Sequence, residues 1–185
     1  MRVACSMMGV ALLLGTGCGG NGGGSAQWRT IDADDSSYTV SMPGQPTPVV
    51  QSVDVPQGKI HIHAQELITQ HVNYTAGYSE YPPGFLASIG ADADAMFDQA
   101  RDTTVKQRNA TITEDKKGTV AGFPSRTLGM QFAMPENSRD ATMRQVLTLA
   151  EGRMYIVQTL VLSGAPAAAN EDASQFHQSF ELNAK

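Results

Sequence analysis

Alternating apolar and polar residues run through much of the chain and predict a sheet of antiparallel strands. Residues 37–42 alternate and then reach Pro43-Gly44, which is typical of a half-buried strand followed by a turn. Residues 59–67 and 71–79 alternate in the same way. We expect a short connection at residues 68–70 to join these two segments as a hairpin, with both apolar sets on one face.

Further strands are predicted on both sides of this hairpin. A short strand is expected among several prolines, and four strands follow later in the chain; they cover 49–55, 110–115, 124–134, 142–150 and 153–162. The tripeptides Lys116-Lys117-Gly118 and Glu151-Gly152-Arg153 are expected to form hairpin turns. Both alternating sets of residues 153–162 are largely apolar, which favours a central strand covered on both faces.

Two segments have helical periodicity instead. Residues 92–107 carry Asp92 and Asp94 at their start, where the helix dipole favours negative charge, and an apolar stripe recurs at the helical repeat. A second helix is expected near the end of the chain, with Phe176 on its buried face and His177 facing water.

The order of these elements predicts the α+β class, with one domain over residues 36–185. We expect an antiparallel β-sheet of about six to seven strands flanked by two main helices. Of the 185 residues, 41% are hydrophobic and 17% are charged, which indicates a chain that folds around its own core. The formal net charge is −5, and the longest basic run is Lys116-Lys117. Because binding to a phosphate backbone requires clustered positive charge, no nucleic-acid partner is expected.

The first part of the chain has the pattern of an export signal. Arg2 supplies positive charge, residues 3–14 are largely apolar, and small residues stand at 15–17, immediately before Cys18. The apolar stretch is shorter than the roughly 20 residues that span a bilayer. We therefore predict a processed leader over residues 1–17. An ordinary cleaved signal that leaves Cys18 as a free thiol is the alternative.

The residues before Cys18 resemble the lipobox of bacterial lipoproteins. Thr16 and Gly17 match its small residues, whereas Gly15 stands where leucine is usual. The resemblance implies that Cys18 is lipidated and anchors the protein to a membrane, with residues 18–35 as a flexible Gly-rich tether. It also implies an exported protein of the bacterial cell envelope. In a Gram-negative cell the expected place is the periplasmic side of the outer membrane, because Gly19 rather than an aspartate follows the cysteine.

Three segments of the predicted domain resemble the PsbP-like fold family and, among its bacterial members, the DcrB-type lipoproteins. They are Tyr38-Thr-Val-Ser-Met-Pro-Gly44, Gly122-Phe-Pro-Ser-Arg126 and Phe176-His-Gln-Ser-Phe-Glu-Leu182. The resemblance covers roughly residues 36–182. It implies an antiparallel sheet flanked by helices, and it implies neither an enzyme nor a set of site residues.

His61 and His63 are the candidate metal ligands. On a strand they would share one face, about 6.5–7 Å apart. A zinc or copper site needs further ligands, and the predicted register leaves His71 about 13 Å from His63. We therefore favour a solvated polar face over a metal site. Arg126 is expected to point outward from its strand rather than to hold a ligand.

No catalytic set and no cofactor fingerprint is present after the leader. The sequence lacks a nucleophile elbow, a phosphate loop, a dinucleotide fingerprint and a zinc-protease pair. We therefore expect no enzyme and no cofactor. The favoured function is a membrane-anchored, non-catalytic binding or accessory module of the envelope, with an envelope protein as its partner. The alternative is a carrier of a ligand or metal, which would use a pocket between sheet and helices or the His61/His63 face.

Overall fold

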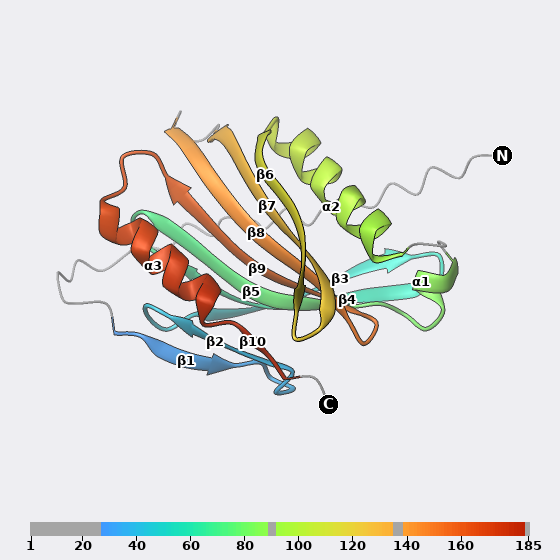
Figure 1. The fold of residues 1–185 in the computed structure, drawn as a ribbon. Coiled ribbons are helices and arrows are strands. Elements are labelled where there is room, and N and C mark those ends of the chain that lie inside the picture. Colours follow the sequence, from blue (N-terminus) through green and yellow to red (C-terminus); the bar gives the residue numbers. More distant parts are fainter. Residues whose placement is uncertain (1–26, 89–91, 135–138, 184–185) are drawn as a thin grey trace.

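The computed structural model describes residues 27–88, 92–134 and 139–183, and its centre is a sheet of seven antiparallel strands (Figure 1). In spatial order the strands are β3 (Thr47–Val55), β4 (Gly58–Ile68), β5 (Val72–Glu80), β9 (Arg153–Leu162), β8 (Arg139–Ala150), β7 (Phe123–Met134) and β6 (Thr111–Val120). The predicted α+β class and the central position of residues 153–162 are confirmed.

Different elements cover the two faces of this sheet. Helix α2 (Ala93–Arg108) lies on one face, which we call the α2 face. Helix α3 (Ala167–Gln178) lies on the other, the α3 face, beside a small sheet of β1 (Arg29–Asp32), β2 (Tyr38–Met42) and β10 (Glu181–Leu182) (Figure 1). The short helix α1 (Phe85–Ser88) packs through Phe85 against β4. The two main helices are those that the sequence predicts.

Each face of the large sheet has its own apolar core, because successive residues of a strand point to opposite faces. The core of the α3 face is rich in aromatic side chains and includes Tyr38, Tyr74, Tyr78, Tyr155 and Phe176. The core of the α2 face is rich in methionine and leucine and includes Met96, Phe97, Leu128, Met130, Met143 and Leu147. Both alternating sets of the inner strands are therefore buried.

The hairpin of β4 and β5 forms as predicted, but its register is different. Ile68 pairs with Asn73, and the turn between them is closed by Thr69, whose hydroxyl and amide both donate to the Val72 carbonyl oxygen at 2.9 Å. This turn shifts the predicted pairing by an odd number of residues, which moves one apolar set to the other face. Ile62 and Ala64 thus lie on the α2 face, whereas Tyr74 and Tyr78 lie on the α3 face.

The hairpin of β6 and β7 turns later than predicted. Lys116-Lys117-Gly118 lies inside β6, and the chain reverses at Ala121-Gly122, whose φ angles of 51° and 84° suit a two-residue hairpin loop. The predicted turn at Glu151-Gly152 is confirmed, with Ala150 paired to Arg153. Lys116 and Lys117 fit within β6 because this strand is an exposed edge of the sheet, where charged residues are common.

The folded part of the chain begins earlier than the predicted tether allows. Arg29–Asp32 forms β1, in which Arg29 pairs with Met42 of β2, so the end of the expected tether, residues 18–35, belongs to the small sheet. Cys18 and the predicted leader lie outside the described residues. In the part of the chain that the structure describes, none of the helices is long and apolar enough to cross a membrane.

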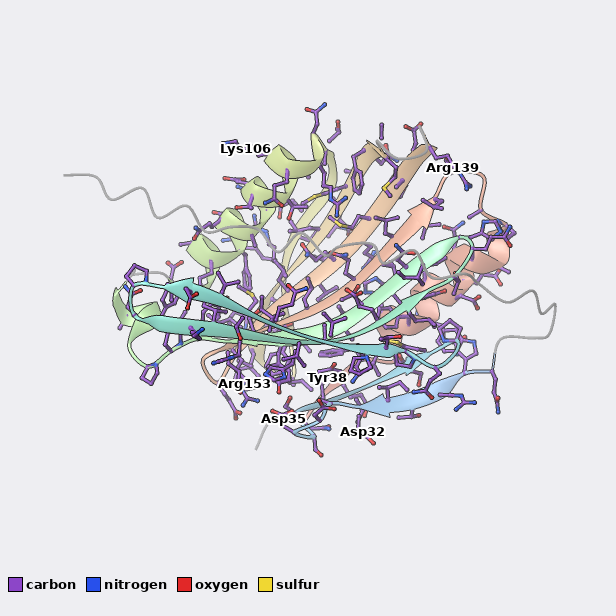
Figure 2. The ribbon with its side chains drawn as sticks, turned by 180° about the vertical axis from the view of Figure 1, so that it is seen from behind. Asp32, Asp35, Tyr38, Lys106, Arg139 and Arg153 are labelled. Atoms are coloured by element: carbon purple, nitrogen blue, oxygen red, sulfur yellow. The ribbon has the colours of Figure 1, made fainter. Side chains whose placement is uncertain are left out.

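Arg153 connects the small sheet to the large one. Its guanidinium bonds to the carboxylates of Asp35 and Glu80 and lies 4.8 Å from the centre of the Tyr78 ring. Nearby, the Tyr38 hydroxyl donates to the Ala76 carbonyl oxygen at 3.0 Å. Figure 2 shows Arg153, Asp35 and Tyr38 on the same side of the sheet. These contacts fix the layer of β1 and β2 on the α3 face.

Candidate functional site

A cavity of about 240 Å³ lies between α2 and the α2 face of the sheet. Side chains of α2 form one wall, and those of β4, β5, β8 and β9 form the other. The apolar part of the lining includes Met96, Ala100, Met143, Leu147, Met154, Ile156 and Leu160. The other lining residues are polar and include Gln99, Thr103 and Arg108 of α2. A partly enclosed space that combines apolar surface with polar groups is typical of a small-molecule site.

Small residues leave this space open. On the floor, Gly77 has no side chain, and the residue paired with it on β4 is Ala64. A Cβ atom at Gly77 would lie 2.4 Å from the His63 carbonyl oxygen, so only glycine fits there. On the opposite wall, α2 presents Ala100 and Thr103. These short side chains leave part of the space between α2 and the centre of the sheet unfilled.

A row of polar side chains crosses the otherwise apolar α2 face. Gln145 of β8 pairs with Gln158 of β9, Gln158 pairs with Thr75 of β5, and Thr75 pairs with Glu66 of β4. Residues that pair across neighbouring strands share a face, with Cβ atoms about 5 Å apart. We call these four residues the polar row. Gln145, Gln158 and Thr75 line the cavity, whereas Glu66 lies beside Thr75 on β4 and outside the lining.

The amide group of Gln145 is only half satisfied. Its Nε2 atom donates to Gln158 Oε1 at 3.2 Å, whereas its Oε1 atom is buried and has no hydrogen-bond partner. The residue is 6% exposed. A buried acceptor without a partner costs about 1–3 kcal/mol. Its oxygen is therefore available to a hydrogen-bond donor that enters the cavity.

Glu66, at the other end of the polar row, also has a hydrogen-bond acceptor without a partner. Its Oε1 atom is buried without a hydrogen-bond partner, and no ion pair to Glu66 is found in the described part of the chain. Burial raises the pKa of this carboxyl above its ordinary value. Both unpaired atoms of the polar row are thus hydrogen-bond acceptors.

An ion-pair network holds the first half of α2 against the sheet, and Arg126 is its centre. Arg126 is 8% exposed and bonds to Asp115 of β6, and its Nη2 atom lies 3.3 Å from Asp98 of α2. Arg101 of α2 contacts Asp98 at 2.8 Å and Asp115 at 3.0 Å. The Arg126 guanidinium holds the pKa of Asp115 below its usual range. The prediction of an outward Arg126 is therefore wrong, because Asp115, Asp98 and, at 3.6 Å, Asp94 surround the residue on the α2 face.

The candidate metal ligands are engaged in other contacts. His63 stacks on Tyr78 with ring centroids 5.0 Å apart, and His61 Nδ1 lies 3.0 Å from Ser52 Oγ. Within residues 27–88, 92–134 and 139–183, no group of three or more potential ligands gathers around them. The pair shares the α3 face of β4, so it lies across the sheet from the cavity.

His177 is half-buried against the sheet rather than solvent-facing as predicted. Its Nε2 atom lies 3.0 Å from the Thr159 hydroxyl of β9, and its Nδ1 atom is buried without a hydrogen-bond partner. Burial, with a smaller contribution from Arg144, lowers the pKa of His177 to about 4. The imidazole is therefore neutral at physiological pH and forms part of the contact between α3 and the sheet.

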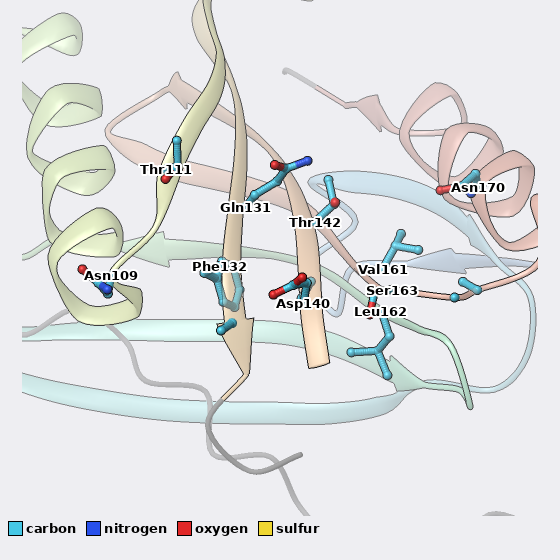
Figure 3. A pocket seen from close by; sticks show the side chains of 14 residues that line it. Asn109, Thr111, Gln131, Phe132, Asp140, Thr142, Val161, Leu162, Ser163 and Asn170 are labelled. Carbon is cyan, nitrogen blue, oxygen red and sulfur yellow. The ribbon is translucent and has the colours of Figure 1, made fainter. Parts of the chain in front are cut away.

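A larger hollow of about 630 Å³ lies at the ends of β6, β7, β8 and β9 (Figure 3). Its lining includes the consecutive residues Gln131 and Phe132 of β7, whose side chains point to opposite faces of the sheet. The hollow is therefore a depression at the ends of the strands and lies outside both apolar cores. It has Asp140 as its single acidic lining residue and lacks a buried, unpaired polar side chain among the described residues.

The comparisons with known proteins support the fold. No protein-family model and no curated protein matches this sequence. Among solved structures, cyanobacterial PsbP (CyanoP) from Synechocystis sp. PCC 6803 is similar with a TM-score of 0.54 and 16% identity, over 89% of this chain and 98% of that one. The Ran-binding protein Mog1p of Saccharomyces cerevisiae has a TM-score of 0.48 and 10% identity, over 85% and 96%. The likeness to CyanoP shows that the chain has the PsbP-like fold.

Sequence reasoning missed the residues of the polar row. The signal available was the position of Gln145 and Gln158, which interrupt strands whose other inward positions are apolar. An isolated glutamine in a strand is ordinary at an exposed position. Only the pairing of four strands shows that these side chains form one line beneath α2.

Proposed function

We propose that this protein is a non-catalytic binding module of the bacterial cell envelope, which holds a small, mostly apolar molecule in the cavity between α2 and the sheet. The observation that carries the proposal is the unpaired Gln145 Oε1 atom in an apolar, partly enclosed space. Polar atoms buried without a partner are rare in folded proteins because they are costly. A bound ligand with a hydrogen-bond donor would supply the missing partner.

The apolar lining gives the ligand its affinity in this proposal. Burial of apolar surface contributes roughly 25 cal/mol per Å², and methionine side chains such as Met96, Met143 and Met154 adapt to irregular shapes. The cavity is slightly smaller than the usual range of about 300–1,000 Å³ for drug-sized ligands. The proposed ligand is accordingly a small molecule or one short chain of a larger one.

We expect a bulky side chain at Ala100 to abolish binding, because Ala100 projects from α2 into the cavity. The Ala100→Phe variant should bind a neutral naphthylamine fluorophore at least tenfold more weakly than the parent protein, as measured by fluorescence titration. The matched control is Ala95→Phe, which places the same side chain on the exposed side of the same helix and should leave binding unchanged. Equal binding by the Ala100→Phe variant, or no binding by the parent, would refute the cavity as a ligand site.

The membrane anchor of this proposal rests on the sequence around Cys18. If Cys18 is acylated, cells that are given radiolabelled palmitate should incorporate label into the protein and retain it in the membrane fraction. The Cys18→Ser variant should incorporate no label and appear in the soluble fraction, because the serine hydroxyl cannot form the thioether to the lipid. Incorporation that persists in Cys18→Ser would contradict the assignment of the anchor.

A further inference from the structure

The polar row also indicates the chemistry of the ligand, and this inference rests on the proposed function. Both unpaired atoms of the row, Gln145 Oε1 and Glu66 Oε1, accept hydrogen bonds and cannot donate while Glu66 is ionised. A ligand that satisfies them must present donors. An anionic head group, such as a carboxylate or a phosphate, would bring a second negative charge toward Glu66.

The position of Glu66 favours a charged donor over a neutral one. Its neighbour in the polar row is Thr75, which is neutral, and the cross-strand partner on its other side is Thr47 of β3. Lys, Arg and His side chains form no ion pair with Glu66 in the described residues. A half-buried carboxylate without a counter-ion is costly, and a cation placed beside it removes most of that cost.

The geometry of the row sets the shape of the ligand. Adjacent strands lie about 4.8 Å apart, so the three steps from Gln145 on β8 to Glu66 on β4 span roughly 14 Å. The apolar lining residues Met143 and Leu147 flank Gln145 on β8, whereas Glu66 lies one strand beyond Thr75 and outside the lining. An elongated molecule with an apolar tail under α2 and a head at Glu66 fits this order.

We propose that the cavity selects an apolar molecule with a cationic amine head, which places its tail beneath α2 and its ammonium group against the Glu66 carboxylate. In this arrangement Glu66 determines the specificity for the head group. The apolar lining determines most of the affinity for the tail. The polar row then has a role in ligand recognition that the stability of the fold does not require.

The test compares three ligands with the same eight-carbon tail: octylammonium, octanol and octanoate. Their affinities are measured by isothermal titration calorimetry with the parent protein. We expect octylammonium to bind at least tenfold more tightly than octanol, and octanoate to bind most weakly. Octanoate binding as tightly as octylammonium would overturn the inference, and so would equal affinity of octylammonium and octanol.

The Glu66→Gln variant tests whether Glu66 causes the preference for octylammonium over octanol. Glutamine keeps the size of the side chain and removes its charge, so octylammonium should lose about tenfold in affinity while octanol is bound as before. An unchanged preference in Glu66→Gln would show that another group selects the head. If octanol and octanoate bind but octylammonium has no advantage, only this inference fails. If none of the three ligands binds, the proposed function fails with it.

Discussion

Replacing Arg126 with methionine is expected to lower the free energy of unfolding by about 3 kcal/mol. Arg126 is 8% exposed and contacts Asp115 and Asp98, so its loss leaves Arg101 as the remaining cation beside these two carboxylates. Methionine preserves the apolar volume of the arginine stem, so the measured change reports the lost ion pairs and not a cavity. Urea unfolding, monitored by circular dichroism at neutral pH, measures it.

Two further variants separate this mechanism from a general loss of charge. Lys116→Met removes a largely exposed partner of Glu114 and should change stability by less than about 1 kcal/mol. The double variant Arg126→Met with Asp115→Leu should recover part of the loss, because both members of a buried pair are then replaced by apolar groups. A double variant that is clearly less stable than Arg126→Met alone would contradict the explanation.

Acidification should destabilise the domain through His177, and the Gln substitution should remove this effect. Burial lowers the pKa of His177 from 6.5 to about 4, so between these values the unfolded chain binds a proton that the folded chain does not. Stability is therefore complete above pH 6.5 and is lost as the pH falls toward 4. A shift of this size corresponds to about 3 kcal/mol.

The measurement is the free energy of unfolding from urea titrations between pH 7 and pH 4. Carboxyl groups titrate in the same range, but they do so in the parent and in His177→Gln alike, so the difference between the two proteins isolates the histidine. The parent should lose about 3 kcal/mol more than His177→Gln over this interval. His61→Gln, which changes an exposed histidine of β4, should follow the parent. Parallel curves for the parent and His177→Gln would disprove the assignment.

The sequence predicted the elements well because their signals are local. The start of α2 is an example: Asp92 accepts a hydrogen bond from the Ala95 backbone amide at 2.8 Å, as expected of an acidic residue before a helical stripe. The turn at Glu151-Gly152 is another, since both residues adopt positive φ and the second of them is glycine. Such preferences depend on a few neighbouring residues, which the sequence displays directly.

The errors arose where two local signals competed or where both faces of a strand are buried. Lys116-Lys117-Gly118 resembles a turn as closely as Ala121-Gly122 does, and only the pairing with β7 selects the second. In β4 and β5 the residues on either face of the strand pack into an apolar core, so the apolar pattern does not specify the register. Arg126 and His177 were assigned to the solvent because charged and polar residues are usually exposed.

By itself the sequence determined the fold class, the order of the strands along the chain and the two amphipathic helices, because hydrophobic periodicity encodes them. It also supplies the pattern at Cys18 on which the expected anchor depends. The tertiary structure alone decided which side chains meet. Gln145, Gln158, Thr75 and Glu66 come from four separate strands, and the cavity brings Ala64 of the sheet and Ala100 of α2 to opposite walls of one space. These contacts depend on strand register and helix placement, which are set by the packing of the whole domain.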